Sequence, residues 1–125
     1  MKAQLSLEYL VLSVILLALL GIALVTLVKI KDNADAQYAA IALKNDAETI
    51  YNAAQDVCAL GDGNSRETTL RGDITVTSSG TTVVFSAKEK GQEFPYKFRC
   101  ESQLSGTLNG RITIANEGGK IVVKN

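Results

Sequence analysis

The stretch YLVLSVILLALLGIALVTLV, residues 9–28, has no charged side chain in 20 consecutive positions. A helix of this length is about 30 Å long, at about 1.5 Å per residue, which matches the hydrocarbon core of a bilayer. In a chain of 125 residues, so long an apolar run cannot belong to the core of a small domain. It therefore predicts a helix that spans a membrane or packs against other apolar helices.

A cleavable secretory signal is the alternative explanation for this apolar segment. The tripeptide Ala-Asp-Ala at residues 34–36 resembles a signal-peptidase site, and cleavage there would release a domain that starts near Gln37. The run is longer than the usual signal core of about 7–15 residues, and the charged residues between positions 29 and 35 would crowd the cleavage region. We therefore expect the helix to be retained, with the signal peptide as the rival interpretation.

The helix is predicted to continue through residues 29–60, because neither proline nor glycine occurs there and strong helix formers are frequent. Gly61 and Gly63 supply the expected C-terminal stop. One apolar stripe recurs at steps of four and three, and consists of Ala36, Ala40, Leu43, Ala47, Ile50, Ala54 and Val57. The acidic residues of the segment lack the dense spacing of calcium ligands, so we expect them on a solvated face. They are Asp32, Asp35, Asp46, Glu48 and Asp56.

Beyond residue 60 the apolar period changes from that of a helix to that of a strand. Residues 61–72 are polar and bounded by glycine, which predicts a surface loop, with a short strand around residues 68–70. Apolar residues then alternate on both sides of Ser79-Gly80 and again on both sides of the NEGG turn at 116–119, which predicts two hairpins. Residues 94–100 also alternate, and Pro95 favours an edge or strand-start position there.

These elements predict an α+β fold. A long N-terminal helical spine has an apolar half, residues 4–28, and an amphipathic half, residues 29–60. Residues 73–125 form a small antiparallel sheet of four to five strands, whose apolar face packs on the C-terminal half of the helix. The even number of cysteines, in a chain predicted to be exported, favours a disulfide between Cys58 and Cys100 over two free buried thiols. That bond would tie the last turn of the helix to the sheet.

The composition excludes several classes of function. The chain has no histidine and no tryptophan, and it lacks a convincing pair of nucleophile and base, so we expect no catalytic residue, no metal site and no cofactor. Residues 62–64 (DGN) begin like a calcium loop but lack its later ligands. Without Lys2, Glu8, Lys29 and Lys31, the remaining residues carry a net charge of −2. The basic residues at 88–99 are interrupted by glutamates, so nucleic acid is not expected as a partner.

Glu8 is the residue that carries the functional signal, because it is a single carboxylate at the mouth of the apolar run. An ionisable group in a membrane segment is costly in lipid and indicates function. One interpretation is that Glu8 only favours the first turn of the helix through the macrodipole. The other is that it pairs with a cation of a neighbouring subunit, such as an α-amine, when the helix leaves lipid for a protein filament.

Gln4, Ser6, Glu8 and Leu12 match the pattern Q-x-S-x-E-x-x-x-L. The sequence therefore resembles the archaeal type IV pilin-like precursors, which carry this class III signal peptide before a long apolar helix. The match is strong over residues 1–12, and the remainder of the chain matches in architecture alone.

The resemblance implies a structural, non-enzymatic function. A prepilin peptidase would cut between Ala3 and Gln4, so residues 1–3 are a leader peptide, and Ser6, Glu8 and Leu12 serve recognition and assembly. The implied partners are the membrane before assembly, a pilus assembly platform and further copies of the chain in an extracellular filament used for adhesion. A minor pilin, or a membrane-anchored binding module that never polymerises, are the alternatives.

Overall fold

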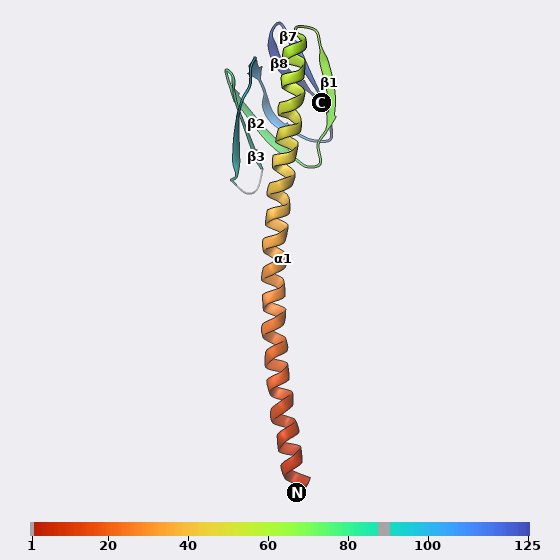
Figure 1. Cartoon of the computed structure of the whole chain (residues 1–125), viewed down its shortest axis with the longest axis vertical. Helices are drawn as coiled ribbons and strands as arrows, with labels where there is room; N and C mark the ends of the chain where they lie inside the picture. The colour runs from red at the N-terminus through yellow and green to blue at the C-terminus, as the bar shows by residue number, and fades with distance from the viewer. Residues whose placement is uncertain (1, 88–90) are drawn as a thin grey trace. The chain divides into compact units, whose positions relative to one another are not determined.

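The computed structural model describes residues 2–87 and 91–125 (Figure 1). Helix α1 runs over Lys2–Leu60. The chain divides into two compact units, residues 1–38 and 39–125. The first contains the apolar part of α1, and the second contains the remainder of α1 together with all the strands.

Eight strands form two four-stranded sheets in the second unit. One sheet has the order β1-β7-β8-β5, from β1 (Ser65–Thr69), β7 (Arg111–Glu117), β8 (Lys120–Lys124) and β5 (Glu101–Gln103). The other has the order β4-β3-β2-β6, from β4 (Glu93–Lys97), β3 (Thr82–Ala87), β2 (Ile74–Ser79) and β6 (Ser105–Leu108). All pairings are antiparallel except that of β5 with β8, which is parallel.

Both predicted hairpins are present. β2 and β3 pair from Ile74 opposite Ala87 to Ser79 opposite Thr82, and β7 and β8 close at Glu117 opposite Lys120. The two residues between them, Gly118 and Gly119, have φ of 63° and 81°. Two consecutive positive φ values match the right-handed twist of the flanking strands, and glycine adopts them without strain.

The α+β class is confirmed, but the structure has more strands than the single sheet of four to five that the sequence predicted. Residues 61–72 include β1, which pairs with β7. The alternating segment 94–100 is one strand only as far as Lys97, since the chain then crosses to the other sheet and becomes β5. β4 lies at an edge, which agrees with the position predicted for Pro95.

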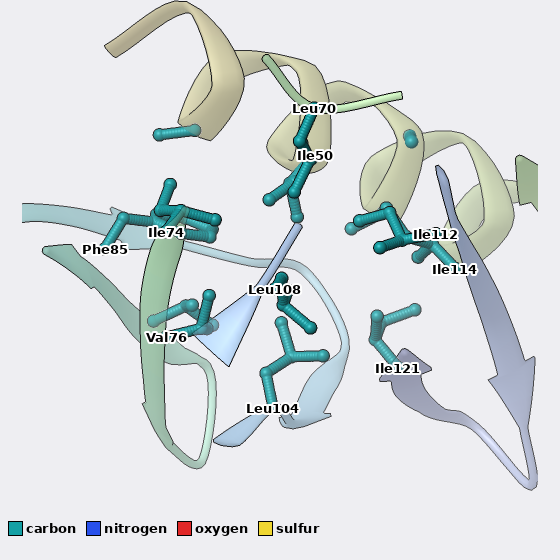
Figure 2. Close-up of a cluster of buried hydrophobic side chains, with 14 of the residues drawn as sticks. Ile50, Leu70, Ile74, Val76, Phe85, Leu104, Leu108, Ile112, Ile114 and Ile121 are labelled. Carbon is teal, nitrogen blue, oxygen red and sulfur yellow. The ribbon is translucent and has the colours of Figure 1, made fainter. Parts of the chain in front are cut away.

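The core lies between the helix and both sheets. Figure 2 shows Ile50 of α1 with Ile74 and Phe85 on one side and Ile112 and Ile114 on the other. The predicted helix stripe is buried at Leu43, Ala47, Ile50, Ala54 and Val57. Ala36 and Ala40 are only partly buried. Because burying apolar surface contributes about 25 cal/mol per Å², this shared core is the main source of stability for the second unit.

The end of α1 is held by polar groups from the residues that follow it and from the distant strand β7. Gly61 has φ of 91°, which stops the helix. The Asn64 amide donates to the carbonyls of Leu60 (3.0 Å) and Gly61 (3.1 Å), and the buried Asn116 amide donates to that of Val57 (3.2 Å). The last carbonyls of a helix have no intrahelical partner, so these bonds fix where the helix ends.

Asp46 corrects the expectation that the acidic residues of the helix lie on a solvated face. Its side chain is 5% exposed, and Oδ2 accepts hydrogen bonds from the backbone N–H groups of Arg71 (3.1 Å) and Gly72 (3.2 Å). A carboxylate can be buried when hydrogen bonds replace its water. Asp46 therefore ties the helix to the connection between β1 and β2.

The predicted disulfide between Cys58 and Cys100 is present, with Cα atoms 5.9 Å apart. It joins the helix near its end to the bend between β4 and β5, across a sequence separation of 42 residues. In the chain-entropy account, closing a loop of this size stabilises the fold by about 4 kcal/mol. That amount is large against the total stability of a small domain.

We predict that reducing this disulfide loosens the strands but not the apolar helix, because the bond closes only the second unit. Amide exchange of the full-length protein in detergent should accelerate in both sheets on adding a reductant, while residues 9–28 keep their protection. The control is the Cys58→Ser/Cys100→Ser variant, whose exchange should not respond to the reductant. Unchanged exchange in the sheets of the reduced wild type would contradict this account.

We also predict that Asp46→Ala lowers the free energy of unfolding by about 2 kcal/mol or more, because two backbone donors lose a charged acceptor. The matched control is Glu48→Ala on the same helix. Glu48 is exposed and makes only an (i, i+4) ion pair with Lys44 at 4.0 Å, which is worth about 0.5 kcal/mol. Urea unfolding in detergent, followed by tyrosine fluorescence, measures both. Equal losses would show that the contacts of Asp46 have no special role.

Candidate functional site

Over residues 9–28 the surface of the first unit is apolar on every side of the helix. All side chains from residue 3 to residue 35 are exposed, including large ones such as Leu16 and Leu19. A helix that is apolar all round is found inside a membrane or inside a larger protein assembly. By length and composition α1 can cross a membrane, which fits membrane insertion and also fits a signal sequence.

Glu8 provides the carboxylate in a shallow groove on this helix. The other groove residues are apolar or aromatic, namely Leu5, Leu7, Tyr9, Val11, Leu12 and Ile15. Within the described residues, Glu8 forms neither an ion pair nor a side-chain hydrogen bond. An acceptor with apolar neighbours and no partner of its own can be satisfied by water, by a lipid headgroup or by a donor from another molecule.

The helix brings some of the predicted recognition residues together and separates another. Gln4, Glu8 and Leu12 follow one another at steps of four, so they lie along one side of α1. Ser6 lies two residues from both Gln4 and Glu8, which places it on a different side. The four residues therefore do not form one cluster in the folded helix.

The predicted processing site lies at the start of the helix. Ala3 and Gln4 are exposed and belong to the first turn of α1, while Met1 of the predicted leader lies outside the described residues. The first N–H groups of a helix have no intrahelical acceptor, so this turn is held by fewer hydrogen bonds than the turns in the middle of the helix.

The other charged and polar candidates of the sequence have structural contacts. Asp62 Oδ1 accepts a hydrogen bond from the Gly118 N–H (2.6 Å), and Asn64 binds the end of the helix, so the DGN segment links α1 to the turn between β7 and β8. In residues 2–87 and 91–125, no group of three acidic, histidine or cysteine side chains comes together as a metal site. Of the weak basic cluster, Lys97 and Arg99 are exposed, while Lys88 and Lys90 lie outside the described residues.

The aromatic residues mostly serve the core. The Tyr51 ring lies 5.2 Å from that of Tyr96 and 5.5 Å from that of Phe98, between centroids. Burial raises the pKa of Tyr96, with smaller contributions from Glu48 and Tyr51. A phenol that is packed and protonated in this way is a structural group. Tyr38 differs, since its side chain is 76% exposed.

One polar hollow was not anticipated from the sequence. It has a volume of about 270 Å³ and lies between α1 and the edge strand β1. Its lining residues are Thr49, Asn52, Ala53, Asp56, Arg66, Glu67 and Thr68. Asp56 and Arg66 form an ion pair, which joins the helix to the edge strand. No sequence signal relates two residues ten positions apart in different elements, so the hollow could not be predicted.

No protein-family model, no curated protein and no solved structure matches this chain. The candidate site itself consists of an uncovered apolar helix that carries one carboxylate, Glu8, in a shallow groove.

Proposed function

We propose that this chain is a structural subunit of a cell-surface filament, similar to the archaeal type IV pilins, and that it polymerises through the apolar part of α1. The observation that carries the proposal is the apolar helix surface, exposed on all sides over residues 9–28 and bearing a carboxylate at its start. Such a surface needs a cover of lipid before assembly and of other helices after it.

Transfer from lipid to a bundle of helices buries the same apolar surface in both states. The hydrophobic effect therefore does not favour the filament over the membrane. Close side-chain packing and a specific polar contact must supply the difference, and Glu8 is the group suited to provide the contact. If the chain is cut between Ala3 and Gln4, Glu8 becomes its fifth residue, and the α-amine of a neighbouring copy is a cation of suitable size.

In the proposed filament, the second unit provides the outer surface and contacts the surroundings, with surface attachment as its function. A minor subunit that starts or ends such a filament would share all these features.

A membrane-anchored binding module is the second candidate. The observation that favours it is the completeness of the second unit, which has its own core, two sheets and a disulfide without help from another copy. In that function α1 would be only an anchor, and Glu8 would have no partner in another subunit.

We predict that Glu8→Ala abolishes filaments while the protein still accumulates in the membrane with its disulfide formed. The matched control is Thr26→Ala, because Thr26 is a polar residue of the same apolar segment whose hydroxyl donates only to the Ile22 carbonyl (2.9 Å). Electron microscopy of sheared cell surfaces should show filaments for the wild type and Thr26→Ala only. Normal filaments from Glu8→Ala would remove the role given to the carboxylate and favour the anchored module.

A further prediction concerns the mature N-terminus. Edman sequencing or intact mass of the protein from its native envelope should give a chain that starts at Gln4. A start near Gln37 would mean that the helix is a removed signal, and it would overturn the filament proposal.

A further inference from the structure

One side of α1 in the first unit carries an apolar line that is interrupted by two opposite charges. Steps of four, three, four, four and three residues place the line on one side of the helix, and it consists of Leu20, Leu24, Leu27, Lys31, Asp35 and Tyr38. Its apolar members are 56–76% exposed, and the two charged ones are also exposed. Lys31 and Asp35 thus occupy positions where the pattern calls for apolar side chains.

Lipid does not suit the whole of this line. Four ionisable residues occur between positions 29 and 35, around the circumference of the helix, and burying them in hydrocarbon would be costly. The line continues past them to Tyr38, so lipid cannot cover all of it. Water can solvate the charged part, and a protein surface with matching charges can pack against it.

Lys31 and Asp35 do not satisfy one another within the chain. They are spaced for an (i, i+4) pair, but with the base before the acid, which is the less favourable order in a helix. The four ion pairs formed by the described residues include neither of them. Both charges are therefore available to another molecule.

We infer that this line is the contact surface for a second copy of the chain, lying parallel and displaced along the helix by four residues, about 6 Å. The inference rests on the proposed function, in which copies share one orientation because they leave the same membrane. At this displacement, Lys31 of the displaced copy lies level with Asp35 of its neighbour.

Charge complementarity selects this displacement over the alternatives. Copies in register would oppose Lys31 to Lys31 and Asp35 to Asp35, which is repulsive for both pairs. A shift of four residues instead brings Leu20 level with Leu24 and Leu24 level with Val28. It places Leu27 level with Lys31, whose aliphatic stem can pack against the leucine. It also places Ala34 level with Tyr38, and the small side chain leaves room for the ring. The two charges therefore fix how far one helix is displaced along the other, at a modest cost in stability.

The contact is separate from that of Glu8. On an ideal helix, a separation of 23 positions places Glu8 and Lys31 on roughly opposite sides. The two residues would accordingly meet different neighbours in a filament, so their contributions can be tested independently.

The test is disulfide cross-linking between co-expressed chains with single added cysteines. One chain carries Leu20→Cys and the other Leu24→Cys, with tags of different size, so that Lys31 and Asp35 stay in place, and filaments are oxidised after assembly. We expect the 20–24 heterodimer to exceed each homodimer severalfold. The control pair is Lys29→Cys with Asn33→Cys, which keeps the spacing of four on another side of the helix and should give no such excess. Antiparallel copies that joined residue 31 to residue 35 would bring residue 20 to residue 46 and would not give the 20–24 product.

Wild-type filaments separate the two proposals. If the wild type assembles and homodimers equal or exceed the 20–24 product, the displaced contact is wrong while the filament proposal stands. If the wild type forms no filaments, the proposed function itself fails. Should the cysteine variants not assemble, charge reversal decides: Lys31→Asp should lose filaments, and Lys31→Asp with Asp35→Lys should regain them. Failure of the double variant to restore assembly would overturn the contact.

Discussion

An α-helix with apolar side chains on every side has to be shielded from water, and this requirement governs the molecule. Residues 9–28 of α1 do not meet this requirement within their own unit, because all of their side chains are exposed. The second unit meets the same requirement internally, since the apolar stripe of residues 43–57 is covered by two sheets. One helix thus contains one segment that completes a domain and another that requires a membrane or other molecules.

Polar groups on an apolar helix then acquire a particular importance. In water, Glu8, Lys31 and Asp35 would be ordinary solvated side chains worth little to any association. Where apolar surfaces exclude water, each must find a partner, and a wrong partner is penalised more than a right one is rewarded. Such groups therefore determine which arrangement of helices is allowed, while the apolar residues around them determine only that some arrangement forms.

Much of the fold follows from periodicity, and the exceptions have identifiable physical causes. Apolar residues at steps of three and four predicted the buried helix positions Ile50 and Val57. Apolar residues at alternate positions predicted β2, β3, β7 and β8. Asp46 was misplaced because its burial depends on two backbone donors 25 and 26 residues later, which no local pattern reveals. β5 and β6 were not predicted because their residues are mostly polar or glycine, so they show no alternation of apolar side chains. At the candidate site, Glu8 and its neighbours stand out in the sequence, but the polar hollow beside β1 depends on how a helix and an edge strand meet.

The disulfide between Cys58 and Cys100 also affects how the second unit responds to a pulling force. A pull along α1 that tends to draw the helix out of the second unit reaches Cys58 near the end of the helix, beyond the buried stripe residues. Sheets and helix can therefore slide past one another only as far as that link allows, even after their side chains have begun to separate. Such a unit would stretch under load yet stay attached, and it could close again when the tension is released.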